Sequence, residues 1–244
     1  MKKDEEKTAS GQPIYRYGEA HNAFNEAKGN EKNMALVLNH IERYFGEIEG
    51  SFQEVVSDQV HLDIHWVKPS KKYNFHLLIS SGMSDQPMNV PKGSEQWQFA
   101  ELCILLPPDW PMPENMTQEW MQAAFSDELI YWPIRWLKMI ARLPHYYNSW
   151  VGYGHTIPNG EDAEAFAETT DLGCMLILNS IDLPEEFVIL QRDEITETHF
   201  YTLVPIFKEE MNCKLNEGTN TLLDKFEEQG IRTVFDLKRK NVCR

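Results

Sequence analysis

Apolar residues return every three or four positions between residues 34 and 48, near the start of the chain. With about 3.6 residues per turn, such positions fall on one side of a helix and polar residues fall on the other. The pattern therefore predicts an amphipathic helix with one buried stripe. The stripe consists of Met34, Val37, Leu38, Ile41, Phe45 and Ile48.

Segments typical of strands follow this helix, because apolar, β-branched and aromatic residues dominate them. Short links rich in turn formers, such as "KPSKK", separate them and favour antiparallel neighbours over helical crossovers. The segment 82–94 is longer and carries glycine and proline, so we expect a loop there. The predicted strands cover 52–56, 60–67, 73–80 and 97–107.

The middle of the chain is predicted to be helical. Thr117 can cap a helix over 117–125, and Pro133 suits the first turn of a helix over 133–143. Pro144 is expected to end that second helix.

The last part of the chain predicts an ordered glycine-rich loop, three apolar strands and two helices. Pro205 lacks a backbone donor, so it should place the end of the last strand at a sheet edge. Gly218 and Gly230 suit the ends of the two helices. The loop covers 151–160, the strands 172–180, 187–191 and 199–207, and the helices 208–218 and 219–230.

Together these elements predict a single α+β domain, in which α-helices flank a mixed, largely antiparallel β-sheet. Strands are grouped on both sides of a central helical block, and no internal repeat or linker divides the chain. We expect the domain over 31–235, after a flexible N-terminal lead over 1–30 and before a short C-terminal tail over 236–244. A chain of 244 residues is long enough to bury a substantial core.

Composition and charge narrow the class of function. Hydrophobic residues make up 42% of the chain, which is typical of a folded globular protein. The formal net charge is −15, from 38 acidic and 23 basic residues. Such a surface repels phosphate backbones and anionic membranes, so neither nucleic acid nor a membrane is an expected partner, whereas a basic protein would be attracted. No apolar run approaches the roughly 18 residues of a membrane span.

The start of the chain and the cysteines bear on its compartment. The first residues, "MKKDEEKTASGQ", contain no apolar segment and do not predict a secretory signal. The cysteines are widely spaced and form no C-x-x-C pair, which favours a reduced, cytoplasmic setting. They are Cys103, Cys174, Cys213 and Cys243.

The stretch "HLDIHWVKPS" at 61–70 carries the main candidate chemistry. Successive side chains of a strand point to opposite faces, so a polar set and an apolar set would lie on opposite faces here. Imidazole and carboxylate groups can bind zinc or transfer protons, so the polar set requires an explanation. The polar set is His61, Asp63 and His65, and the apolar set is Val60, Leu62, Ile64 and Trp66.

Glu101 is expected to join the polar set, because a carboxylate inside a strongly apolar strand must be paired or hydrogen-bonded. His76 is a weaker candidate. Three interpretations remain open: a hydrogen-bonded polar layer, a surface that contacts a partner, and a metal-dependent or catalytic site. Alternating positions on one strand lie roughly 6–7 Å apart, which makes convergence on one metal awkward. The polar layer is therefore favoured, and a metal-dependent enzyme using this His/Asp/Glu cluster is the alternative.

Other enzyme signatures are missing from the sequence, which has no Walker loop, no G-x-G-x-x-G after a strand, no G-x-S-x-G and no H-E-x-x-H. We therefore assign no catalytic residue, no metal ligand and no cofactor. The string "GYGHTIPNG" contains His155 and Asn159, two further candidates for partner binding or polar contacts. His155 lies among glycines and is expected to fasten the loop by hydrogen bonding.

Five strings occur in order along the chain: "FQEVVSDQVHLDIHWVKPS", "LLISSGMSDQPMNVP", "FAELCILLPPDW", "LKMIARLPHYYNSWVGYGHTIPNG" and "LVPIFKEEM". Together they resemble the bacterial suppressor of fused family over about residues 34–230. "GMS", "AEL-x-I-x-LP-x-DW" and "GHTIPNG" are quite specific in combination. One departure is Gln53, where family members often carry histidine, and this loss weakens the enzyme interpretation further.

The resemblance implies a non-enzymatic protein-binding module. The animal relative has an additional C-terminal domain and clamps an extended peptide of a transcription factor as an added strand. Bacterial members are proposed to be immunity proteins that neutralise polymorphic toxins. For this chain the resemblance therefore implies a protein that occludes its partner, with a basic toxin domain as the expected partner. It does not identify the strand edge that would bind.

Overall fold

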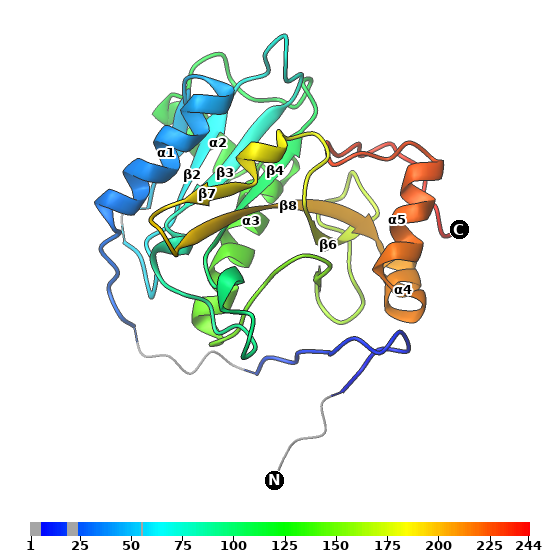
Figure 1. The fold of residues 1–244 in the computed structure, drawn as a ribbon. Helices are drawn as coiled ribbons and strands as arrows, with labels where there is room; N and C mark the ends of the chain where they lie inside the picture. The colour runs from blue at the N-terminus through cyan, green and yellow to red at the C-terminus, as the bar shows by residue number, and fades with distance from the viewer. Residues whose placement is uncertain (1–5, 19–23, 55) are drawn as a thin grey trace.

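The computed structural model describes residues 6–18, 24–54 and 56–244. Within these residues eight strands form one sheet, which crosses the molecule between helices on its two faces (Figure 1). The strand order is β1-β2-β3-β4-β8-β6-β5, and β7 pairs with β8 beside this path. Every strand pair is antiparallel except β4–β8, which is parallel. The predicted α+β class with a mixed, largely antiparallel sheet is confirmed.

The bounds of the elements are as follows. The strands are β1 (Gly50–Phe52), β2 (Asp63–Val67), β3 (His76–Ser81), β4 (Ala100–Leu106), β5 (Thr156–Pro158), β6 (Leu172–Leu178), β7 (Ile189–Gln191) and β8 (Glu197–Phe207). The helices are α1 (Glu31–Phe45), α2 (Gln118–Phe125), α3 (Glu128–Tyr146), α4 (Lys208–Glu217) and α5 (Thr219–Glu228). Three short 3-10 helices are η1 (Met83–Asp85), η2 (Glu95–Trp97) and η3 (Glu185–Phe187).

Alternation along the strands divides the core between the two faces of the sheet. Leu62, Ile64 and Trp66 belong to the cluster that packs against α3. Val67, two positions beyond His65, belongs to the cluster that packs against α1. The predicted separation of the polar and apolar sets around β2 is therefore confirmed. A third cluster fills the space under α4 and α5.

The prediction of a helix over 117–125 is confirmed, because Thr117 caps α2 and the helix ends at Phe125. Both predicted ends of the next helix, 133–143, were wrong. Asp127 caps α3, which begins five residues before Pro133 and continues through Pro144 to Tyr146. Pro144 has no N–H to donate to the carbonyl four residues before it, so the helix continues past this proline with one hydrogen bond fewer. The amides beyond Pro144 still find carbonyls, because Tyr147 N donates to Leu143 O at 3.1 Å.

Several strand boundaries also differ from the predictions. The predicted loop 151–160 contains β5, and the strand predicted over 52–56 is β1, which ends at Phe52. His61 precedes β2 rather than lying within it. The two predicted strand groups join in space, because the parallel pairing of β4 with β8 connects them.

Pro205 lies in an interior strand, since β8 pairs with β4 on one side and β6 on the other. However, β4 pairs with β8 only as far as Thr202, so Pro205 lies beyond that partner. Its carbonyl accepts a hydrogen bond from Arg239 Nη2 at 3.2 Å. On its β4 side, Pro205 therefore has no strand partner, as the prediction of an edge requires. On its other side β8 pairs with β6, so β8 as a whole is not an edge strand.

Both ends of the described chain pack against this domain. Phe235 N donates to Leu105 O at 3.2 Å beside the end of β4. Arg239 forms a buried ion pair with Glu210 of α4, at 2.6 Å between Nη1 and Oε1. Part of the predicted N-terminal lead, residues 1–5 and 19–23, lies outside the described residues. Within the described part of the chain, no helix has the length and apolarity needed to cross a membrane.

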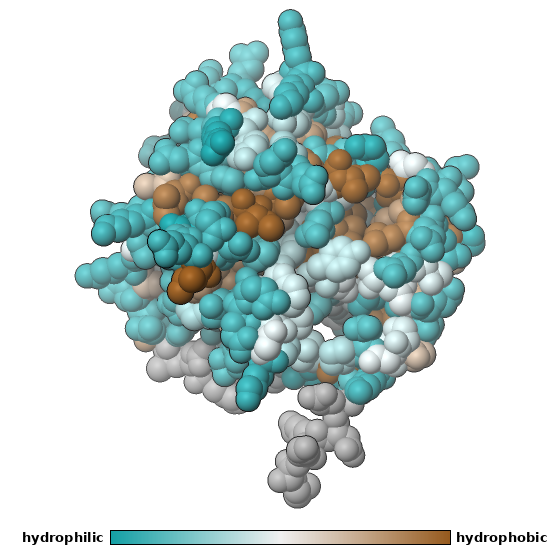
Figure 2. Space-filling view, in the orientation of Figure 1, coloured by the Kyte–Doolittle hydropathy of each residue, from teal (hydrophilic) through white to brown (hydrophobic). Residues whose placement is uncertain are grey.

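The face of the molecule in Figure 2 is largely hydrophilic, which agrees with the acidic composition. Hydrophobic residues are nevertheless visible in patches across its middle. Exposed aliphatic side chains in the β7–β8 region include Ile189 and Ile195, with exposed fractions of 42% and 92%. This surface is therefore not uniformly polar.

Candidate functional site

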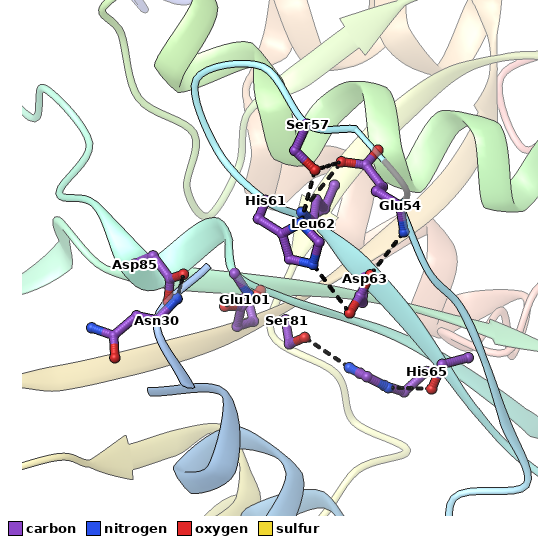
Figure 3. A network of polar contacts seen from close by, with 12 residues as sticks. Asn30, Glu54, Ser57, His61, Leu62, Asp63, His65, Ser81, Asp85 and Glu101 are labelled. Carbon is purple, nitrogen blue, oxygen red and sulfur yellow. Dashed lines mark hydrogen bonds and ion pairs between the residues drawn. The ribbon is translucent and has the colours of Figure 1, made fainter. Parts of the chain in front are cut away.

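A polar network surrounds the start of β2, and its members come mainly from the segment between β1 and β2 (Figure 3). Ser57 Oγ donates to Glu54 Oε2 at 2.7 Å and lies 2.9 Å from His61 Nδ1. The other ring nitrogen of His61 is 3.5 Å from Asp63 Oδ2. Glu54 also forms an ion pair with Arg142 of α3. His61 and Asp63 thus lie together, as the sequence predicts.

His65 belongs to a separate arrangement further along β2. Its Nδ1 and Nε2 each lie 2.7 Å from a serine hydroxyl, that of Ser51 on β1 and that of Ser81 on β3. Burial lowers the pKa of His65 to about 4, although the charge of Asp63 acts in the opposite direction. The ring is therefore neutral at pH 7, and both of its nitrogens have protein partners.

Glu101 on β4 is fully buried and accepts four hydrogen bonds. The donors are the hydroxyls of Ser80 and Ser84, at 2.5 and 2.7 Å, and the backbone amides of Gly82 and Ser84, both at 3.0 Å. Burial raises the pKa of this carboxyl, and the hydrogen bonds oppose that shift. The carboxylate fastens the turn that follows β3. Its need for hydrogen-bond partners was correctly predicted.

Gly82 allows that turn to approach the chain before β2. Its φ is +101°, in a region that favours glycine, and a Cβ there would lie 1.9 Å from the carbonyl oxygen of His61. A larger residue would therefore separate the turn from the segment that carries His61. This contact gives a physical reason for the "GMS" string.

Three residues that the sequence analysis missed connect the turn to α1 and β7. Asp85 accepts from Asn30 N and Asn33 Nδ2, both at 2.7 Å. Arg192 donates to Asn33 Oδ1 at 2.7 Å and to Ser84 O at 2.9 Å. These partners are more than fifty positions apart, so no local pattern reveals them. Asp85 follows the "GMS" string directly, which was the one available signal.

The network does not present a metal-binding arrangement. Among the described residues, no three His, Cys, Asp or Glu side chains are grouped so as to hold a metal ion. Donors within the protein already satisfy Glu101, and two serines flank His65. His76 lies elsewhere, where its Nδ1 accepts from Trp66 Nε1 at 3.1 Å, and Gln53 is exposed. The geometry is that of a hydrogen-bonded polar layer.

His155 and Asn159 lie apart from this network and flank β5. The His155 ring packs edge-on against Trp150, with 4.3 Å between ring centroids, and burial lowers its pKa to about 4. Asn159 Nδ2 donates to the carbonyls of Glu164 and Ala165, at 3.0 and 3.2 Å. The His155 ring thus packs against aromatic rings, whereas Asn159 organises the loop after β5 by hydrogen bonding.

β5 is the last strand of the sheet, and β6 is its strand partner. His155 O accepts from Ile177 N, and Asn159 N donates to Gly173 O, so the backbone groups of these two flanking residues point toward β6. Along an antiparallel strand the N–H and C=O groups of successive residues point to alternate sides. The backbone groups of Thr156 and Pro158 therefore point away from β6, toward the outer edge. Proline has no N–H, so Thr156 supplies the outward donor of this edge.

The N-terminal segment lies along the loop that precedes β5. The rings of Tyr17 and Tyr147 stack at 4.8 Å, and the Tyr17 hydroxyl is 2.5 Å from Ser149 Oγ. Trp150 Nε1 donates to the Tyr15 hydroxyl at 3.3 Å. Aromatic side chains therefore border the β5 edge.

Comparison with known proteins identifies the family to which this fold belongs. The family model of the suppressor of fused protein matches residues 58–240, which is more than half of the chain. The chain belongs to the suppressor of fused family. The resemblance drawn from the sequence strings is thereby confirmed. No curated protein sequence matches the chain at a significant level.

Solved structures of suppressor of fused proteins share the fold. A protein described as a homologue from Neisseria gonorrhoeae FA 1090 has a TM-score of 0.61 and 18% identity, with 87% of this chain and 98% of that chain covered. Sufu in the Sufu–Fu complex has a TM-score of 0.58 and 13% identity, with 86% and 92% covered. Drosophila Suppressor of Fused has a TM-score of 0.57 and 14% identity, with 90% of this chain but 52% of that chain covered. This chain thus spans about half of the Drosophila protein.

Proposed function

We propose that this suppressor of fused protein is a non-enzymatic protein-binding module that occludes its partner, and that it acts as a cytoplasmic immunity protein against a toxin. The observation that carries the proposal is the outer edge of β5, a partly exposed strand end between His155 and Asn159. An extended segment of a partner can pair with such an edge through backbone hydrogen bonds.

The composition of the edge supports a selective contact. Thr156 offers a donor and an acceptor, whereas Pro158 offers only an acceptor, which limits indiscriminate pairing with other strands. The bordering rings of Trp150 and His155 supply apolar area of the kind that anchors interfaces. A related protein, Sufu, has been crystallised in complex with Fu, so the fold is compatible with a protein partner.

Charge supports the choice of a toxin with a basic face. The net charge of −15 would accelerate encounter with a cationic surface, such as that of a nuclease. The four cysteines are free thiols, as expected in a reducing cytoplasm. A cytoplasmic binder with this charge could cover the basic face on which such a toxin depends.

The test starts with the reading frame adjacent to the gene: its product is co-expressed with this protein, and growth and co-purification are measured. Thr156→Pro removes the outward amide of β5, and Thr156→Ala is the matched control that keeps it. We expect Thr156→Pro to weaken the complex at least about tenfold, as loss of backbone pairing and edge geometry would. Thr156→Ala should bind like the wild type.

Melting temperatures of both variants establish that each is folded. Failure of the wild-type protein to bind the toxin or rescue growth would refute the immunity role. Equal binding by both variants would move the contact away from the β5 edge.

A further inference from the structure

A groove of about 460 Å³ lies beside β8, apart from the polar layer around β2. Aromatic side chains dominate its walls: Trp97, Trp150, Tyr153 and Tyr201 line it together with His199. Trp97 is 41% exposed and Tyr153 is 47% exposed, so these rings are accessible from outside. His199 and Tyr201 stack with an interplanar angle of 12° on the floor of the groove.

The topology of the sheet explains why a groove exists here. β8 pairs with two strands in succession on one side, first β7 at Glu197–His199 and then β6 from Thr202 onward. The two shorter strands therefore leave an interval beside the middle of β8. The groove lies at this interval, because Asn179 after β6 and Ile189 of β7 both line it.

Acidic side chains outnumber basic ones around the groove. The segments that supply its lining are 94–99, 149–154, 179–191 and 197–201, and they contain no lysine or arginine. Their carboxylates are Glu95, Asp182, Glu185, Glu186 and Glu197. Glu197 Oε2 is 3.9 Å from His199 Nε2 and its side chain is 39% exposed, whereas Asp182 is paired with Arg232 at 2.7 Å.

The nearby Arg192 does not compensate this charge within the groove. Its guanidinium is bound to Asn33 and Ser84 and stacks over the ring of Phe99, 4.2 Å from the centroid. Accessible aromatic faces next to carboxylates are the environment that favours an organic cation. A planar guanidinium suits it better than an ammonium group, because it can stack on indole and phenol rings.

We infer that this groove receives an arginine side chain from a basic segment of a protein partner. The inference rests on the proposed function, since it assumes that the partner is a protein. It adds that the partner presents an arginine, which pairing with the β5 edge does not require. The guanidinium would lie against Trp97 and Tyr153, with Glu197 at the rim. An extended partner segment on β5 and an arginine in this groove could belong to one partner, because Trp150 borders both surfaces.

The experiment titrates the full chain with an acetylated, amidated Gly-Arg-Gly-Arg-Gly peptide and, separately, with the same peptide carrying citrulline in place of arginine. Citrulline keeps the shape of arginine and removes its charge. Binding is followed by the NMR signals of the tryptophan indole N–H groups. We expect saturable shifts with the arginine peptide and at least about fivefold weaker binding of the citrulline peptide.

Variants locate the site. Trp97→Leu keeps an apolar side chain but removes the π face, and it should weaken the arginine peptide about threefold to fivefold. Combined with Tyr153→Leu, the loss should reach about tenfold or more. Phe125→Leu is the matched control, because Phe125 is 46% exposed on α2, away from the groove, and it should bind like the wild type. Circular dichroism checks that each variant is folded.

Two results would overturn the inference. Equal binding of the two peptides would mean that the groove does not select a cation, and unchanged binding by the double variant would mean that the net charge attracts the peptide elsewhere. Because the probe is a peptide and not the toxin, either result leaves the β5-edge test intact. Loss of toxin binding by Thr156→Pro with normal peptide binding would, conversely, separate the two surfaces.

Discussion

The polar layer around β2 and the β5 edge both contain residues that the sequence singled out, but they differ in how far the protein itself uses their hydrogen-bonding groups. In the polar layer, Glu101 accepts four hydrogen bonds and His65 lies between two serines. At the β5 edge, Thr156 directs its backbone outward. In this protein the dense group of titratable residues therefore stabilises the fold, whereas the three-residue strand β5 is the candidate site of contact with a partner.

The largest effect should come from Glu101→Leu. The substitution leaves buried donors of the turn after β3 without their acceptor, so we expect the free energy of unfolding to fall by about 3–5 kcal/mol. Denaturant unfolding measures this change, and Glu101→Gln, which keeps an acceptor, should cost less. If the folded fraction of Glu101→Leu lost partner binding while Glu101→Gln kept it, the polar layer would have to be part of the contact surface.

The stability of the polar layer should depend on pH through His65. Its pKa is about 4 in the folded state against 6.5 as the ordinary value, so the unfolded chain binds the proton more tightly. The contribution of neutral His65 is therefore fully present above pH 6.5 and is lost as the pH falls toward 4, by about 3 kcal/mol in all. Unfolding at a series of pH values should show a shallower acid loss for His65→Gln than for the wild type. Identical slopes would show that His65 is not the buried neutral group.

Asp63→Asn tests the part of the layer that touches α3 and the β1–β2 segment. Asp63 contacts His61 through one oxygen and accepts from Glu54 N at 3.0 Å through the other. Deleting its charge should lower the free energy of unfolding by about 1–3 kcal/mol. Thermal unfolding and partner titration on the same variant would decide its role, because a fully stable variant that no longer binds would move β2 from scaffold to recognition site.

The smallest effect on stability is expected at the β5 edge, from His155→Ala. The ring packs against Trp150, and an aromatic contact of this kind contributes about 1 kcal/mol beyond the effect of the area that it buries. Partner affinity should fall by more than this loss of stability explains. A variant that loses stability but binds normally would make His155 a packing residue alone. In that respect the β5 edge would then not differ from the polar layer around β2.

The sequence alone determined features that depend on local pattern. The alternation around Leu62, Ile64 and Trp66 predicted which face of the strand is apolar, because strand geometry fixes that alternation. The need of Glu101 for hydrogen-bond partners also followed from its apolar neighbours. The ordered strings predicted the family, which the family model confirmed.

Tertiary structure decided the features that depend on distant partners. The sequence places "TIP" in a glycine-rich loop, and only pairing with β6 makes it a strand. Pro144 remains helical because nearby carbonyls still accept the following amides. Likewise, Asn33, Asp85 and Arg192 meet only after the sheet has formed, and the aromatic groove exists only because β7 and β6 pair in succession with β8. Local patterns record which face of an element is buried, whereas the contacts of an edge or a groove depend on which elements the fold brings beside it.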